Sequence, residues 1–283
     1  MNVLENRIFR VELYPEQGTF SILTLDESFP SLLNVQLTLE YSIDGRKVRQ
    51  ALRSWQLISP AAKVQLSAHG EVEKLNFSIP TDGNGLSVEL EFGILQEYPL
   101  VIWKARLLNQ GIRPVKIDRI VLLDLGPKQG QVRFNRAQKP EQMGFFSNGW
   151  QSWSTTQWYP ADGAMQPSRL GKFQLPMTQY AGTPLKRRPG EFSSDFFAVV
   201  GDQLARTGFL VGFLSQKQQF GSIDCKFGRS IALQMWASGD GARLEPRQSF
   251  ETDWAVFNPV LLDARDPLGK YTEAVARENA VKL

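Results

Sequence analysis

The clearest chemical pattern in the chain lies at residues 145–154, which read FFSNGWQSWS. Two tryptophans, Trp150 and Trp153, stand three residues apart, with Asn148 and Gln151 beside them. In one interpretation the segment is a tight turn in which one tryptophan fills the core. In the other it contacts a sugar, because a pyranose ring packs its C–H groups on an indole face while amides and hydroxyls pair with its hydroxyl groups. The residue types alone leave both interpretations open.

Other side chains that commonly carry chemistry are scarce. The 283 residues include one histidine, His69, and one cysteine, Cys225. This count excludes an intrachain disulfide, a multi-cysteine zinc site and a histidine-cluster metal site. A Ser-His-Asp or Cys-His mechanism would need His69, whose surroundings (SAHG) predict a surface turn. We expect Cys225 to pack as a small apolar side chain, and we expect no cofactor and no metal.

Charge and hydropathy exclude two further classes of partner. Lys and Arg number 32 against 29 Asp and Glu, a net charge of +3 that is too small to indicate nucleic-acid binding. The basic cluster at residues 186–188 lies between prolines and is expected to be a solvated loop. No window reaches the roughly 18 apolar residues of a membrane span, and charges occupy the N-terminal region where a signal peptide is apolar. We therefore expect a soluble, cytoplasmic protein without a membrane partner.

The elements that must position the motif are predicted to be strands. Apolar and polar residues alternate along residues 35–43 and 86–94, as they do in a strand with one buried face. Asp44-Gly45 and Asp240-Gly241 follow such stretches and favour tight hairpin turns. No helical periodicity precedes residue 260, which argues against folds built of βα units. The pattern predicts an all-β antiparallel sandwich or barrel.

One long segment interrupts this pattern. Residues 138–192 are rich in proline and in aromatic residues, which indicates an ordered loop packed on the sandwich. Strands are predicted again at residues 195–200 and 207–215. The second of these is apolar almost throughout, so we expect a central strand covered on both faces.

The end of the chain is predicted to be a helix. Asp266 and Pro267 suit the N-cap and first helical positions, and Leu268, Tyr271 and Val275 fall on one apolar face. The expected organisation is therefore a β domain at residues 1–262 and a helix at residues 263–283. Such a helix can dock on the sheet or lead into another domain.

The motif NGWQSWS at residues 148–154 resembles the N-terminal domain of glycoside hydrolase family 36, the α-galactosidases and their relatives. Weaker matches follow in the family's order along the chain. They are SDFFA at 194–198, GFLS at 212–215, LEP at 244–246, DPLGKY at 266–271 and VAREN at 275–279. Residues 1–140 match only in strand character.

The resemblance implies a large antiparallel β-supersandwich, similar to galactose mutarotase, with residues 263–283 as a linker helix toward a catalytic barrel that this sequence lacks. Trp153 matches the tryptophan that reaches the bound galactoside. Trp150 and Gln151 match positions that hold the loop, and Asn148 completes the set of candidate substrate-binding residues. The implied partners are an α-galactoside-type carbohydrate and the barrel. A homo-oligomer is left open, because in oligomeric members the cleft can belong to a neighbouring subunit.

Catalysis in that family is carried out by two barrel aspartates, a nucleophile and an acid/base, as in retaining glycosidases. The motifs that hold them are absent from this sequence. Asp195 at a strand start, Asp202 in a turn and Asp263 in the linker are expected to be capping or solvated residues. We therefore assign no catalytic residue and expect the chain alone to be inactive.

Two other functions stay open. A free-standing carbohydrate-binding or scaffold β-sandwich would bury Leu268, Tyr271 and Val275 on its own sheet, whereas a severed domain would expose them as an apolar patch. A sandwich enzyme of the mutarotase type is disfavoured, because it would use a pair of histidines as acid and base and only His69 is present.

Overall fold

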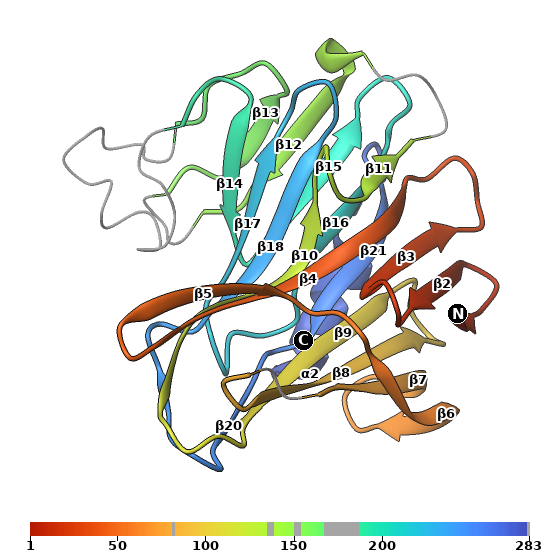
Figure 1. Ribbon diagram of the computed structural model, residues 1–283. Helices are drawn as coiled ribbons and strands as arrows, with labels where there is room; N and C mark the ends of the chain where they lie inside the picture. Colours follow the sequence, from red (N-terminus) through yellow and green to blue (C-terminus); the bar gives the residue numbers. More distant parts are fainter. Residues whose placement is uncertain (81–82, 135–138, 150–153, 167–186, 282–283) are drawn as a thin grey trace.

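The computed structural model describes residues 1–80, 83–134, 139–149, 154–166 and 187–281. In this part of the chain the strands form two antiparallel sheets (Figure 1). The first sheet runs in the order β1 (Asn2–Glu5), β2 (Phe9–Tyr14), β3 (Thr19–Thr24), β4 (Ser31–Ile43), β10 (Val115–Leu125), β18 (Ala232–Ser238), β17 (Gly221–Lys226) and β14 (Glu191–Asp195). Two short strands, β5 (Arg46–Ala51) and β11 (Gln131–Arg133), pair with β4, and β19 (Arg243–Leu244) pairs with β10.

Residues 143–147 and 157–160, predicted to lie in an ordered loop packed on the sandwich, are instead strands of the second sheet, which also contains the last strand. Its order is β13 (Gln157–Pro160), β12 (Met143–Ser147), β15 (Phe197–Asp202), β16 (Thr207–Phe213), β21 (Ala255–Leu261), β9 (Val101–Asn109), β8 (Leu86–Leu95), β7 (Gly70–Ile79) and β6 (Gln56–Leu66). Strand β20 (Ser249–Glu251) pairs with β9, and a short 3-10 helix, η1 (Pro140–Gln142), precedes β12. The predicted all-β sandwich is therefore confirmed.

Local sequence patterns account for individual strands. Residues 35–43 lie in β4 and residues 86–94 in β8, and their alternating apolar side chains are buried. Asp44 and Gly45 have φ values of 50° and 77°, the left-handed conformations that a tight turn between β4 and β5 requires.

Aromatic side chains join the two sheets. Trp103 on β9 of the second sheet is fully buried, and its Nε1 donates to the carbonyl of Leu122 on β10 of the first sheet at 2.8 Å. The ring of Phe20 on β3 packs between Trp103 and Phe92, with centroid distances of 5.5 and 5.0 Å. These contacts cross the core between the two sheets. The indole ring of Trp103 is therefore packed against another aromatic ring, and its buried N–H group has a hydrogen-bond partner.

Strand β16 is covered on both faces, as its apolar sequence predicted. All seven residues of Thr207–Phe213 are buried. Phe209 and Val211 belong to the core between the sheets, whereas Leu210 belongs to a second apolar cluster on the outer face. The cover on that outer face is α2 (Gly269–Glu278), whose Tyr271 and Ala274 belong to the same cluster.

The helix begins later than predicted. Its N-cap is Leu268, without a side-chain hydrogen bond, so the expected cap at Asp266 and first turn at Pro267 are wrong. The local reason is that residues 262–268 form turns and bends before the chain reaches the sheet surface. Within α2, Glu273 and Arg277 pair at 3.1 Å, as their i, i+4 spacing predicts.

Polar contacts also hold α2 against the sheet. The hydroxyl of Tyr271 donates to the carbonyl of Phe213 at 2.8 Å, and Asn279 Nδ2 donates to the carbonyl of Leu214 at 2.9 Å. His69 Nε2 lies 2.7 Å from a carboxylate oxygen of Glu278. His69 is 1% exposed, so its expected place on the surface is wrong: the end of α2 covers the turn that carries it.

We expect Tyr271→Ala to lower the free energy of unfolding by about 3–5 kcal/mol, because the change empties a fully buried aromatic site and leaves the Phe213 carbonyl unpaired. Urea unfolding followed by circular dichroism measures this loss. Thr272→Ala, on the exposed side of the same turn, is the matched control and should stay within about 0.5 kcal/mol. Equal losses in the two variants would show that α2 does not depend on this contact.

Candidate functional site

The predicted strand at residues 195–200 is in fact two strands in different sheets. Asp195 ends β14 in the first sheet and Phe197 begins β15 in the second. Between them, Phe196 has a φ of 74°, a rare conformation for a bulky residue. Its N–H donates to the carbonyl of Gly221 on β17 at 2.8 Å, and its carbonyl accepts from Phe213 N on β16 at 3.0 Å. We call residues 195–197 the crossing, since its backbone bonds join both sheets.

The crossing needs a small residue beside it. A Cβ atom at Gly212 would lie 2.5 Å from Cβ of Phe197 and 2.7 Å from the carbonyl oxygen of Phe196. These distances are shorter than side chains tolerate, so the close approach of β16 to the crossing requires glycine here. The nearly continuous apolar sequence of residues 195–200 could not reveal this change of sheet.

The NGWQSWS segment starts from the crossing. Asn148 follows β12 directly, and its carbonyl accepts from Asp195 N at 3.1 Å. Its side-chain Nδ2 donates to the carbonyl of Asp195 at 2.8 Å, and its own N–H donates to Ser194 Oγ at 2.7 Å. One residue earlier, Ser147 Oγ donates to the carbonyl of Ser193 at 2.7 Å. The base of the segment is therefore attached to β14 and the crossing.

The other end of the segment returns to the same place. Gly149 N donates to Thr156 Oγ1 at 3.0 Å, which joins the two ends, and Ser154 is buried at 4% exposure. Of the predicted substrate-binding residues, Asn148 is described and half-buried. Trp150, Gln151 and Trp153 lie outside the described residues. The described ends of the segment thus lie close together, and its predicted sugar contacts stay a prediction.

Asp195 has a more unusual setting than a capping or solvated residue. It is 7% exposed, and its Oδ1 accepts from Ser222 Oγ at 3.3 Å. Burial raises the pKa of its carboxyl group to about 6, with Asp224 also raising it, and the bond from Ser222 opposes the shift. The expectation that Asp195 is solvated or capping is wrong, because the pairing of β14 with β17 places it beside the buried Ser222, where it is shielded from solvent.

The other acidic residues and Cys225 match expectation. Asp202 accepts from Leu204 N and Ala205 N at 2.8 and 2.9 Å in a turn, and Asp263 is exposed and paired with Arg206 at 3.1 Å. Cys225 is 3% exposed in the core, where burial raises the pKa of its thiol. No group of three or more potential metal ligands occurs among the described residues.

The basic cluster at residues 186–188 differs from expectation at one position. The side chain of Arg187 is only 9% exposed and pairs with Asp224 at 2.7 Å. Arg188 is exposed, as predicted, and Lys186 lies outside the described residues. The solvated-loop prediction is wrong for Arg187 because Asp224 on β17, distant in sequence, neutralises its charge. The described part of the chain contains no helix long and apolar enough to cross a membrane.

An apolar groove lies on the outer face of the second sheet, beside the start of α2. It has a volume of about 420 Å³, and Phe146, Trp158 and Leu268 are among its lining residues. Trp158 Nε1 is buried without a partner among the described residues. Both aromatic residues stand in the irregular segment that the sequence singled out, but only the pairing of β12 with β13 places them together on this face.

Comparisons with known proteins support the fold. No family model matches the sequence, and a search of curated proteins by sequence found no match. Among solved structures, the chain is similar to an α-N-acetylgalactosaminidase of Bifidobacterium bifidum, with a TM-score of 0.60 and 9% identity. The match covers 99% of this chain and 39% of that protein, so the chain spans well under half of the enzyme's length.

Two further structures have the same architecture. A galactose mutarotase related enzyme of Lactobacillus acidophilus has a TM-score of 0.55 at 8% identity, over 92% of this chain and 98% of that one. A glycoside hydrolase family 36 α-galactosidase of Geobacillus stearothermophilus has a TM-score of 0.50 at 13% identity, over 85% of this chain and 32% of that one. The chain therefore has the galactose-mutarotase-like supersandwich fold that the sequence resemblance implied, and this fold forms only part of the larger enzymes.

We expect Asp195 to make stability depend on pH. The folded-state pKa of about 6 lies above the ordinary value of 3.8, so the folded protein binds more protons in between. The residue's contribution is therefore present below pH ~4 and is lost as the pH rises through ~6. Asp195→Asn should remove this loss, so the variant gains stability over wild type between pH 4 and pH 7, by on the order of 3 kcal/mol.

Urea unfolding across this pH range measures the difference. Asp263→Asn, which alters an exposed carboxylate, is the control and should follow the wild-type profile in parallel. An Asp195→Asn profile that is also parallel to wild type would contradict the raised pKa of Asp195.

Proposed function

We propose that this chain is the non-catalytic N-terminal domain of an α-galactosidase-like glycoside hydrolase. One observation carries the proposal: nearly the whole chain superposes on 39% of a longer glycosidase. The NGWQSWS motif at residues 148–154 supports the same assignment by resemblance. In this proposal residues 1–262 form the supporting sandwich, and residues 263–283 lead toward a catalytic barrel.

In the proposed enzyme the loop at residues 148–154 shapes the galactoside-binding cleft. Its base suits this task, because Asn148 is bonded to Asp195 and Gly149 is bonded to Thr156 near the other end of the loop. Trp153 would pack on the sugar ring, with Trp150 and Gln151 holding the loop. The partners are then an α-galactoside-type carbohydrate and the barrel, with the homo-oligomer still an open question.

The described carboxylates offer no substitute for the barrel's catalytic pair. Asp195 is buried beside Ser222 on the first sheet, and Asp202 accepts hydrogen bonds from two backbone amides. His69 is buried against α2 rather than placed in a cleft. These settings support a chain whose role is binding and support.

A second candidate is a free-standing carbohydrate-binding or scaffold sandwich, and two observations favour it. Tyr271 is fully buried on the chain's own sheet, and Leu268 and Val275 pack half-buried around it, as that candidate requires. The match to the mutarotase related enzyme covers 98% of that protein, so the same architecture exists without a barrel.

We expect the purified chain to show no turnover of an aryl α-galactoside, because it lacks the paired catalytic aspartates of a retaining glycosidase. Release of the aryl group, followed by absorbance, is the measurement. Turnover that disappears in Asp195→Asn or Asp224→Asn would show that the chain carries its own catalytic carboxylates and would contradict the proposal. Equal turnover in all variants would point to a contaminating enzyme, which repurification removes.

The two candidates differ in the coding sequence that they require beyond residue 283. Sequencing the reading frame past this residue should find a barrel domain with the aspartate motifs. A stop codon directly after it would reject the proposed enzyme domain and leave the free-standing sandwich.

A further inference from the structure

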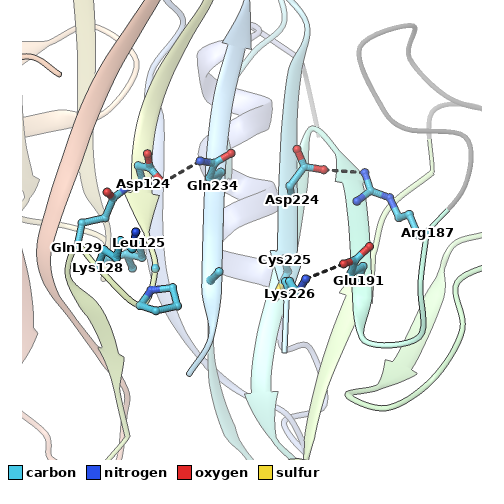
Figure 2. Close-up of a pocket in the computed structure, with 13 residues that line it drawn as sticks. Asp124, Leu125, Lys128, Gln129, Arg187, Glu191, Asp224, Cys225, Lys226 and Gln234 are labelled. Atoms are coloured by element: carbon cyan, nitrogen blue, oxygen red, sulfur yellow. Dashed lines mark hydrogen bonds and ion pairs between the residues drawn. The ribbon is translucent and has the colours of Figure 1, made fainter. Parts of the chain in front are cut away.

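A polar groove lies on the outer face of the first sheet, and nothing in the proposed function uses it. Its volume is about 460 Å³, within the ~300–1,000 Å³ range of small-molecule sites. Figure 2 shows its side chains on β10, β18, β17 and the segment around β14. Its polar lining includes Asp124, Gln234, Asp224, Arg187, Glu191 and Lys226.

The register of three strands brings three polar side chains together at the centre of the groove. Asp124 on β10 is directly opposite Gln234 on β18, which is directly opposite Asp224 on β17. Opposite residues project from the same face with strands about 4.8 Å apart, so the three side chains form a straight row. The two carboxylates thus stand roughly 10 Å apart with an amide between them.

Hydrogen bonds within the row fix the orientation of each polar group. Gln234 Nε2 donates to Asp124 Oδ1 at 2.8 Å. Arg187 Nη2 donates to one oxygen of Asp224 at 2.7 Å, and Trp236 Nε1 donates to the other at 2.9 Å. Figure 2 shows the first two of these bonds as dashed lines across the groove. The polar atoms are therefore preorganised, which lowers the cost of binding a ligand.

Two groups in the row keep unused hydrogen-bonding capacity. The Arg187 side chain is 9% exposed, yet its Nε is buried without a partner among the described residues. Within the same part of the chain no group donates to Gln234 Oε1. A buried, unpaired N–H group costs about 1–3 kcal/mol, so it needs an explanation such as a ligand oxygen.

The charge of the groove indicates which ligand fits. Each of its three acidic residues is already paired with a basic one: Asp124 pairs with Arg49 at 3.3 Å and Asp224 with Arg187 at 2.7 Å. Glu191 and Lys226 neutralise each other at 2.8 Å. Lys128, which is exposed, is the one charged lining residue outside these three ion pairs among the described residues, so the groove attracts an ionic ligand only weakly. Pro127 and Ala232 add apolar surface, which suits the C–H face of a sugar ring.

We propose that this groove binds a neutral carbohydrate of one or two sugar units. The sugar hydroxyls donate to Asp124, Asp224 and Gln234 Oε1, and a ring or hydroxyl oxygen accepts from Arg187. This site consists of residues other than the NGWQSWS loop, and it does not depend on whether the chain supports a barrel.

Isothermal titration calorimetry of the full chain with D-galactose, D-glucose and melibiose tests the proposal, with D-glucuronate and galactose 1-phosphate as anionic probes. At least one neutral sugar should bind with a millimolar or lower Kd. Asp224→Asn should raise that Kd about tenfold or more, since a hydrogen bond to a charged group is lost. Ala232→Leu keeps every polar group but fills the groove beside Gln234, and it should weaken binding similarly. Ser230→Leu, at an exposed position outside the groove, should bind like wild type.

Trp153→Ala tests the sugar contact proposed for the loop and so separates it from this site, whose binding Ala232→Leu should weaken. Loss of binding in Trp153→Ala but not in Ala232→Leu would assign the sugar to the loop and overturn the groove. No heat from any neutral sugar, in a chain whose circular dichroism shows intact folding, would overturn it as well. Tighter binding of the anionic probes would overturn the assignment of a neutral ligand. None of these outcomes affects the test of the reading frame beyond residue 283. The groove proposal and the proposed enzyme domain can therefore be rejected independently of each other.

Discussion

The passage of the chain from one sheet to the other at Phe196 is the constraint on which the rest of this structure depends. The residue adopts a φ of 74°, and its backbone bonds to β17 on one side and β16 on the other. A strained backbone conformation of this kind persists only where the surrounding structure holds it in place. Here hydrogen bonds to strands of both sheets hold it. Asn148 attaches the start of the NGWQSWS segment to the same point, where Asp195 is also buried.

The crossing also connects two strands whose sheets form the opposite outer faces of the sandwich. Upstream, β14 forms the edge of the first sheet and contributes one wall of the polar groove. Downstream, Phe197 opens β15 and its ring packs on Tyr271 of α2, with centroids 5.1 Å apart. The groove thus lies on one side and the helix-covered apolar face on the other. A sugar in the groove and a domain beside α2 would therefore meet different sheets.

The helix covers the apolar outer face at the centre of the second sheet. Strand β16 presents Leu210 outward, and α2 covers it with Tyr271 and Ala274. The same packing buries His69 under the end of the helix, where Glu278 is its partner. An apolar strand in this sheet therefore depends on a helix distant in sequence. This dependence fits both a free-standing sandwich and a domain whose helix continues into a larger enzyme.

The sequence by itself determined the class of fold, most strands and the presence of the final helix, because alternation, turn dipeptides and helical spacing are local properties. It also singled out residues 148–154. Only the tertiary structure decided which polar groups are buried. Asp195, His69 and Arg187 looked like surface residues, and their partners lie on other strands or on α2. Likewise, Asp124 and Gln234 are 110 residues apart and meet only through strand register. The physical reason is that burial and charge pairing depend on long-range packing, which no local pattern encodes.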